Sequence, residues 1–353
     1  MKDIKEYTRK ELGEWFKKRK IKPFRAIQIF KWLYIHQANS FDEMTDISKD
    51  MRLMLKQNFF IPRLKLENLE TSIDGTEKLL FKLRDNKYIE SVIIPGKNRH
   101  TLCISSQVGC AQKCKFCLTA KTGLQRNLTC SEIISQISEA RQIFIKKNKD
   151  KDKDKKKTIS NIVFMGMGEP LANYANVIKS IAIITDGDYG MKISPRRVTV
   201  STSGFVPQIK KLGVNTNVNL AISLNATEDK TRSMLMPINK KYPIKNLLQV
   251  CSEFNIKPRN KITFEYILIK NINDTNKDAE KLVKMLSPIK AKVNLIPFNE
   301  HEKSNFKQSS SSRISQFFKI LLDKNITAII RKSKGADISA ACGQLKGKFE
   351  IKQ

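Results

Sequence analysis

The chain has 353 residues and carries 66 Lys and Arg against 34 Asp and Glu, for a formal net charge of +32. Hydrophobic residues make up 40% of it, enough to build a core, so wholesale disorder is excluded. The longest apolar runs, such as residues 181–184, fall far short of the roughly 18 residues that span a bilayer, and the first residues lack the apolar stretch of a signal peptide. We therefore expect a cytoplasmic protein without membrane contact.

Charge and cysteine content narrow the class of function. A large positive charge indicates a polyanionic partner, and nucleic acid is the first candidate, although an A- and T-rich genome would also enrich the chain in lysine. Seven cysteines are an odd number, and the chain shows no export signal, so metal binding or catalysis fits them better than a disulfide scaffold.

The first 60 residues predict a small helical domain. Residues 8–11 and 40–43 each have the capping-box pattern that starts a helix, and the rings of Trp15 and Trp32 are expected in its core. A basic cluster in this domain is either an RNA contact or merely a solvated helix face, and it comprises Arg19, Lys20, Lys22 and Arg25.

Residues 61–95 predict a small β linker region, with two short strands around the turn at Asp85 and Asn86. From residue 101 the chain alternates between strand and helix patterns. The predicted strands are 101–105, 159–165, 197–201, 219–224, 262–269, 293–297 and 327–331. Predicted helices between them include 130–147, 172–185, 244–254, 278–286 and 310–322.

This alternation predicts an α/β fold with a parallel sheet, and the number of units suits a partial (β/α)6 barrel over residues 96–335 better than a closed eight-fold one. Residues 336–353 form the expected C-terminal loop and tail. The lysine-rich segment 146–157 reads as a solvated loop insertion or a frayed helix end. In such folds, chemistry sits at the C-terminal ends of the strands.

Cys110, Cys114 and Cys117 form a C-x3-C-x2-C motif directly after the first strand of the alternating region. Thiolates select zinc or iron–sulfur. A structural zinc takes four ligands, and the spacing of His100 to the motif fits no standard zinc site. Three thiolates on a four-iron cluster would instead leave one iron open for a cofactor or substrate, which favours a [4Fe-4S] cluster.

The position of this motif resembles that in the radical S-adenosylmethionine (SAM) superfamily. Further motifs, in chain order, are CISSQVGC at 103–110, FMGMGEPL at 164–171, VTVSTSG at 198–204, NLIPFN at 294–299 and AACGQL at 340–345. With these motifs, nearly the whole chain is similar to the RlmN/Cfr family of RNA adenosine methyltransferases, and to its RlmN branch more than to its Cfr branch. The lysine-rich segment is the main departure.

The resemblance implies a radical SAM barrel that holds one [4Fe-4S] cluster on the three motif cysteines and binds SAM. The residues that it places in the SAM pocket are Gly168, Glu169, Ser201, Ser223, Leu224, Asn225 and Asn299. Taken singly, a Ser or Asn at a strand end more often caps the next helix than binds a ligand. The glycines would bring the backbone close to the ligand, and Glu169 would accept from its ammonium.

The resemblance also implies a reaction path. Cys342 would be methylated by one SAM, and the radical from a second SAM would take a hydrogen from that methyl. The methylene radical would add to adenine, Glu90 would accept the adenine proton, and Cys103 would release the product through a transient disulfide with Cys342. Cys130 and Cys251 have no motif around them and are expected to be structural.

The implied product is C2-methylated adenosine in the peptidyl-transferase region of 23S rRNA and beside the anticodon of tRNA. Such a base must be unstacked to be reached. The resemblance further implies a monomer and an electron donor such as flavodoxin or ferredoxin. Two alternatives stay open: C8 methylation of the rRNA adenosine, and a zinc-stabilised RNA-binding protein without catalysis.

Overall fold

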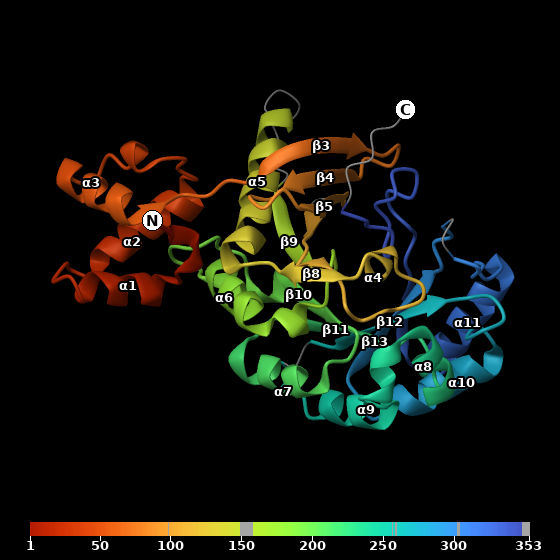
Figure 1. The fold of residues 1–353 in the computed structure, drawn as a ribbon. Helices are drawn as coiled ribbons and strands as arrows, with labels where there is room; N and C mark the ends of the chain where they lie inside the picture. The colour runs from red at the N-terminus through yellow and green to blue at the C-terminus, as the bar shows by residue number, and fades with distance from the viewer. Residues whose placement is uncertain (98, 149–157, 256, 258–259, 302–303, 348–353) are drawn as a thin grey trace.

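The computed structural model describes the whole chain except residues 98, 149–157, 256, 258–259, 302–303 and 348–353, and shows a helical lobe beside a larger α/β body (Figure 1). The lobe contains α1 (Arg9–Lys17), α2 (Phe24–Phe30), which continues as a π-helical turn over Lys31–Ile35, and α3 (Lys49–Asn58). The two-residue strands β1 (Lys2–Asp3) and β2 (Phe59–Phe60) pair in parallel and bring its two ends together. The predicted helical domain is therefore confirmed.

The capping pattern at residues 8–11 acts as predicted, because the Thr8 side chain accepts from the Glu11 amide and the Glu11 carboxylate accepts from the Thr8 amide at 2.7 Å. The pattern at 40–43 also forms, but it caps a 3-10 turn over Phe41–Glu43 and not an α-helix. Trp15 is buried as expected. Trp32 is only half-buried, since its indole N–H reaches out to the Asp46 carboxylate at 2.5 Å.

The larger body is built on one ten-stranded sheet in the order β14-β13-β12-β11-β10-β9-β6-β5-β4-β3. Strands β6 to β14 in this order run parallel, whereas β5, β4 and β3 continue the sheet antiparallel. The bounds of its strands are β3 (Lys65–Thr71), β4 (Glu77–Lys82), β5 (Tyr88–Pro95), β6 (His100–Cys103), β9 (Ile159–Phe164), β10 (Val198–Thr202), β11 (Asn219–Ser223), β12 (Ile262–Leu268), β13 (Ala291–Pro297) and β14 (Thr327–Ile330).

All seven predicted strands of the alternating region are present within two residues of their expected bounds. Each parallel strand lies beside the strand of this sheet that precedes it along the chain. Within the described residues β14 pairs with β13 alone, so the barrel is open as predicted. The strands predicted around Asp85 and Asn86 are β4 and β5. Because β5 pairs with β6, the region 61–95 extends the main sheet and is continuous with it.

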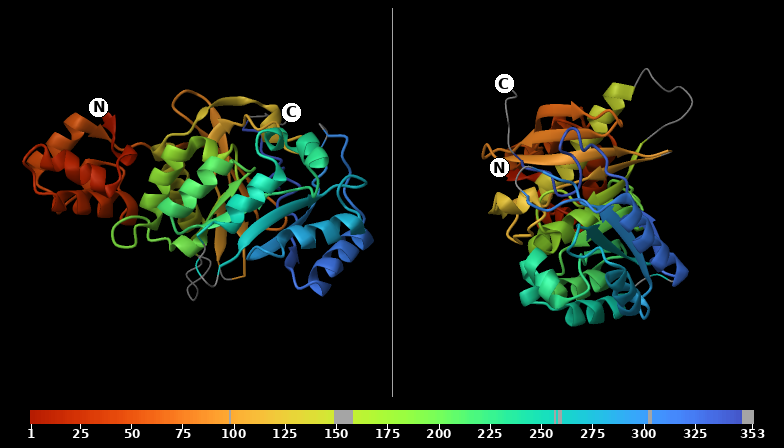
Figure 2. Two further views of the ribbon diagram at one scale, coloured as in Figure 1. Left: turned by 90° about the horizontal axis from the view of Figure 1, so that it is seen from below. Right: turned by 90° about the vertical axis from the view of Figure 1, so that its right-hand side faces the viewer.

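Helices cover the outer side of the curved sheet, as the two views of Figure 2 show. They are α5 (Cys130–Asn148), α6 (Tyr174–Thr185), α7 (Val206–Asn215), α9 (Ile244–Ser252), α10 (Asn276–Leu286) and α11 (Ser311–Asp323). Five of these match predicted segments, and α7 lies outside them, as does the short α8 (Asp229–Leu235). Two short elements near the site, α4 (Leu118–Lys121) and the hairpin of β7 (Gln107–Gly109) with β8 (Leu124–Asn127), were also not predicted.

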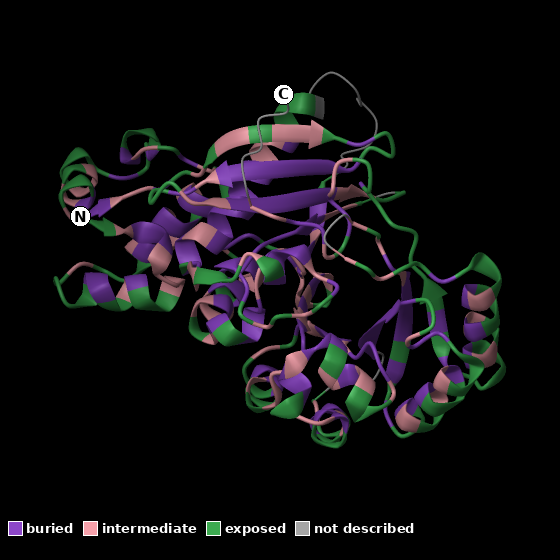
Figure 3. Cartoon of the chain, turned by 45° about the vertical axis from the view of Figure 1, so that its right-hand side comes forward, coloured by how far each residue is buried: buried purple, intermediate pink, exposed green. Residues whose placement is uncertain are grey.

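The central strands are the most buried part of the molecule, purple in Figure 3. All seven residues of β12 are buried, as expected for a parallel strand covered on both faces. Lys146 and Lys147 continue α5, and the rest of the lysine-rich segment from residue 149 lies outside the described residues. Among the described residues, no helix has the length and apolar character needed to cross a bilayer.

Candidate active site

A cavity of about 270 Å³ opens at the C-terminal ends of the parallel strands. It gathers side chains from segments far apart in the sequence. Among the residues predicted as functional, those lining it are Cys103, Cys110, Cys114, Cys117, Gly168, Glu169, Ser201, Ser223, Asn225 and Cys342. This placement is the one that the β/α architecture predicts for chemistry.

The three motif cysteines lie on the loop between β7 and α4. The Cys110 amide donates to the Gly123 carbonyl at 2.9 Å, and the Cys117 amide donates to the Cys114 carbonyl at 3.2 Å, so the loop folds back on itself. Cys114 and Cys117 also pack against a separate apolar cluster that includes Phe116 and Met236. An apolar shell of this kind limits solvent access to a metal centre.

The thiols fit a cluster better than a single ion. Burial raises the pKa of Cys110 to about 12 and holds that of Cys114 well above its usual range, so each needs a cationic centre to become a thiolate ligand. Within the described part of the chain, no three His, Cys, Asp or Glu side chains converge on one point as a single ion requires. A zinc ion needs its sulfurs about 2.3 Å away, whereas a four-iron cluster takes each thiolate on a separate iron, so the three sulfurs need not converge on one point.

Glu169 is buried beside these cysteines at the turn that follows β9. One carboxylate oxygen accepts from the Ser203 amide and hydroxyl, both at 2.7 Å, and the other accepts from the Leu171 amide at 3.0 Å. Burial raises the pKa of Glu169, and these hydrogen bonds oppose that shift. The carboxylate is therefore held in one orientation at the cavity wall.

Gly168 is required at its position for two reasons. Its φ of +97° lies in the region that side-chain-bearing residues rarely adopt, and an added Cβ would lie 2.5 Å from the Gln107 Cβ. The Gln107 side chain in turn accepts from the Glu169 amide at 2.8 Å. The glycine thus lets the strand-end turn pack tightly against β7 and aims Glu169 at the cavity.

The remaining predicted SAM-pocket residues divide into two groups. Ser201, Ser223 and Asn225 line the cavity. Leu224 lies outside the lining, with its amide donating to the Glu265 carbonyl at 3.1 Å. Asn299 also lies outside it, and its side-chain amide donates to the Cys342 carbonyl at 3.2 Å, so it holds the C-terminal loop.

Sequence reasoning missed Arg232, which lies in α8 and is fully buried. Its guanidinium donates to the carbonyls of Ser203, Ser223 and Leu224 and to the Asn239 side chain, at 2.7 to 3.1 Å. These acceptors lie at the ends of β10 and β11 and in the following 3-10 turn. A single side chain therefore fixes the two strand ends that carry the predicted SAM residues. No motif in the sequence marks it.

The C-terminal loop carries Cys342 over the cavity, and several polar contacts anchor it. Asp74 accepts from the Gly335 amide at 3.1 Å, Asp337 accepts from the Ser72 hydroxyl at 2.6 Å, and the Leu118 amide donates to the Gly343 carbonyl at 2.7 Å. The last contact ties the loop directly to the end of the cysteine motif. The loop is therefore held in place from both sides.

Cys103 and Cys342 line the same cavity as free thiols. Burial, together with repulsion from Cys342, raises the pKa of Cys103 to about 12, so this thiol is neutral at physiological pH. Cys342, by contrast, is exposed to solvent. Cys130 and Cys251 are buried outside the cavity, in keeping with a structural role.

Glu90, predicted as the proton acceptor, does not line this cavity. It is buried in β5, and one carboxylate oxygen accepts from the amides of Lys346 and Gly347 at 2.7 and 2.9 Å. Lys78 lies 3.7 Å from the other oxygen, and also binds Glu70 and the Ile338 carbonyl. Burial raises the pKa of Glu90, whereas the loop amides and Lys78 oppose the shift.

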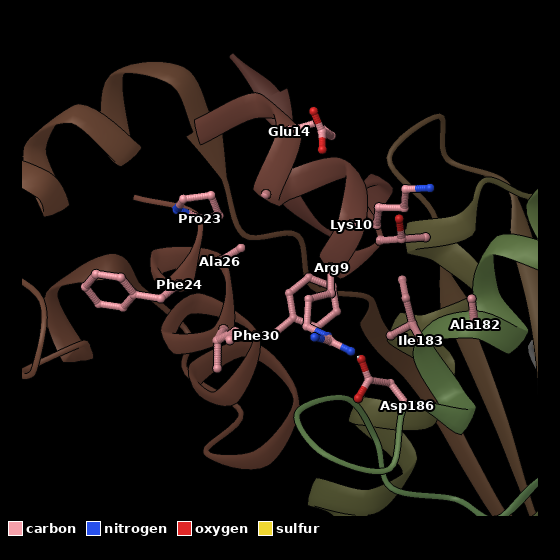
Figure 4. A pocket seen from close by; sticks show the side chains of 13 residues that line it. Arg9, Lys10, Glu14, Pro23, Phe24, Ala26, Phe30, Ala182, Ile183 and Asp186 are labelled. Atoms are coloured by element: carbon pink, nitrogen blue, oxygen red, sulfur yellow. The ribbon is translucent and has the colours of Figure 1, made fainter. Parts of the chain in front are cut away.

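A larger hollow of about 710 Å³ lies elsewhere, between α1, α2 and α6 (Figure 4). Its walls are mostly apolar, with Ala26 and Phe30 on one side and Ile183 on the other. The Arg9 guanidinium contacts the Asp186 carboxylate at 2.8 Å and so links the helical lobe to α6. None of the motif residues lines this hollow, so its size does not make it the reaction site.

Comparisons with known proteins agree with this site. Residues 2–61 match the ribosomal RNA large subunit methyltransferase N-terminal domain, and residues 104–286 match the radical SAM superfamily. The chain is 54% identical to the dual-specificity RNA methyltransferase RlmN of Desulfosudis oleivorans, with 97% of this chain and 90% of that protein covered. It is 50% identical to RlmN of Geobacter sulfurreducens, with 99% and 93% covered.

A solved structure is similar over the same extent. The crystal structure of a radical SAM methyltransferase from Sphaerobacter thermophilus superposes with a TM-score of 0.90 at 38% identity, covering 99% of this chain and all of that one. The similarity therefore includes the helical lobe, the open barrel and the C-terminal loop. The chain belongs to the RlmN family of the radical SAM superfamily.

Proposed function

We propose that this protein methylates C2 of adenosine in 23S rRNA and in tRNA, with the adenosines in the peptidyl-transferase region and beside the anticodon as targets. One observation carries the proposal. The three cysteines of the motif and Cys342, more than 220 residues later in the chain, line one cavity at the C-terminal ends of the strands. A cluster site next to a free thiol is the arrangement that methyl transfer through a cysteine requires.

Cys110, Cys114 and Cys117 hold the proposed [4Fe-4S] cluster, which supplies one-electron reduction of SAM when bound. Glu169 and the backbone beside Gly168 position the amino group of SAM in this proposal, because both residues line the cavity and a carboxylate can accept from an ammonium. Ser201, Ser223 and Asn225 line the rest of its pocket. Arg232 keeps the two strand ends in register.

Cys342 carries the methyl group in transit, and Cys103 serves as the resolving thiol in the same cavity. In this proposal Glu90 takes the adenine proton once a covalent adduct has made the ring carbon acidic. Since the Glu90 carboxylate is bound by the Lys346 and Gly347 amides, that segment must move before the carboxylate can act. The loop therefore both delivers Cys342 and covers the base.

The helical lobe is the proposed docking surface for the RNA backbone. Arg19, Lys20 and Lys22 are exposed on it, and the Arg25 guanidinium lies over the exposed Phe24 ring, 4.8 Å from its centroid. Such a surface suits phosphates and unpaired bases. The proposal includes a cytoplasmic monomer and an electron donor of the flavodoxin or ferredoxin type.

The test is nucleoside mass spectrometry of rRNA and tRNA from a bacterial host that lacks adenosine C2 and C8 methylases, with and without this protein. The proposal predicts 2-methyladenosine in both RNA pools. Cys342→Ala protein should yield none, whereas Cys251→Ala protein, changed at a buried cysteine outside the cavity, should retain the activity. Formation of 8-methyladenosine, or of no product, would refute it.

A further inference from the structure

Glu265 is a buried carboxylate inside the reaction cavity to which no motif assigns a role. It lies in the middle of β12 and is 6% exposed, yet it forms part of the cavity lining. The Asn294 side-chain amide donates to its Oε1 at 2.7 Å. Its Oε2 has no hydrogen-bond partner among the described residues. A buried acceptor without a donor is costly and is rarely retained unless a ligand or an ordered water supplies one.

The sheet places this carboxylate beside the proposed SAM pocket. Glu265 pairs in register with Ser223 of β11 on one side and with Asn294 of β13 on the other. Residues in register on neighbouring parallel strands face the same side of a sheet. Ser223 lines the cavity, so Glu265 lies in the same row and on the same face.

Asn294, the hydrogen-bond partner of Glu265, is a second buried side chain with an acceptor atom that has no donor among the residues described. It is 7% exposed, its amide group is used by Glu265, and its Oδ1 has no donor within the described part of the chain. Two adjacent buried side chains thus each keep one acceptor without a partner. Of the two, Glu265 lines the cavity, so an O–H or N–H donor of a ligand there would satisfy its free oxygen.

From this geometry, and resting on the proposed function, we propose that Glu265, oriented by Asn294, is a reactant-binding residue that accepts a hydrogen bond from a hydroxyl or amine donor in the cavity. Two groups bring such donors there: the ribose diol of the SAM nucleoside and the exocyclic amine of the target adenine. A charge-assisted hydrogen bond in a buried site contributes about 10- to 100-fold to affinity.

Titration calorimetry on anaerobic, cluster-loaded protein tests the cofactor arm with S-adenosylhomocysteine and its 2′-deoxy and 3′-deoxy analogues. If the ribose is the donor, unmodified protein should bind at least one deoxy analogue about 10- to 100-fold more weakly, and Glu265→Gln protein should lose that discrimination. Fluorescence anisotropy tests the substrate arm with a target RNA that carries adenosine or purine riboside, which lacks the amine. If the adenine amine is the donor, the unmodified protein should discriminate only between the adenosine RNA and the purine riboside RNA.

Glu77→Gln is the matched control. Glu77 is a buried glutamate of β4 that also keeps one unpartnered oxygen, but it pairs with Lys147 and lies outside the cavity. The Glu77→Gln substitution should leave the affinities for S-adenosylhomocysteine and for the target RNA within about twofold of those of the unmodified protein. The proposal is overturned if unmodified protein binds all analogues of both sets equally, a result that needs no variant to fold. Absence of 2-methyladenosine alongside clear analogue discrimination would instead count against the proposed reaction and leave the binding role intact.

Discussion

Replacing Arg232 with methionine should destabilise the protein strongly, because methionine fills similar space but donates no hydrogen bond. The guanidinium donates to four acceptors at 2.7 to 3.1 Å, three of them buried and the Ser223 carbonyl partly buried, and three of the four are backbone carbonyls at strand ends. Burial lowers its pKa to about 10, so it is charged at neutral pH. Each acceptor left without a donor costs roughly 1–3 kcal/mol, and part of this is recovered because the desolvation cost of the charge disappears.

The expected net loss is about 3–5 kcal/mol in the free energy of unfolding, a large share of the roughly 5–15 kcal/mol typical of a folded protein. Urea unfolding followed by circular dichroism measures it. Arg19→Met is the matched control, since Arg19 is exposed and stacks on Trp15, and we expect it to cost no more than about 1 kcal/mol. An Arg232→Met protein within 1 kcal/mol of the unmodified one would refute the reasoning.

Three further predictions follow from the site. Gly168→Ala should abolish measurable S-adenosylhomocysteine binding in calorimetry, because the added Cβ would lie 2.5 Å from a neighbouring side-chain carbon; retained affinity would contradict this. The methylation rate should fall as pH drops through the raised pKa of Glu90, since a base must be ionised. Lys78→Met removes a cation 3.7 Å from the carboxylate, so the acidic limb of the pH–rate profile should move to higher pH. An acidic limb that does not move would contradict the assigned contact. Cys114→Ser should lose iron and the brown colour of the anaerobic protein while Cys251→Ser keeps both, and equal iron contents would exclude the cluster site.

The sequence was sufficient to predict the open parallel barrel, because each parallel strand is a short run of mostly apolar residues and because strands that follow one another in the chain are neighbours in the sheet. The helices α7 and α8 were harder to find. The first has Pro207 in its first turn and contains Gly213, and the second has only seven residues. Short helices leave little periodicity to detect.

The site was predictable where residues lie within a motif and not where long-range packing decides. The spacing of Cys110, Cys114 and Cys117 is local, so a loop that carries three cysteines into the site could be predicted. The contact between Glu90 and the amides of the C-terminal loop joins residues about 256 positions apart, and nothing in either segment indicates it. For Glu265 a signal existed: a charged residue in the middle of an otherwise apolar buried strand.

The central claim is that the methyl group passes through Cys342 and loses a hydrogen on the way. Mass spectrometry of the product formed in vitro from SAM with a fully deuterated methyl group tests this directly. Abstraction of one deuterium from the methylated cysteine predicts 2-methyladenosine whose new methyl retains two deuteriums. A methyl that retains all three would show direct transfer from SAM to the base and would contradict the account.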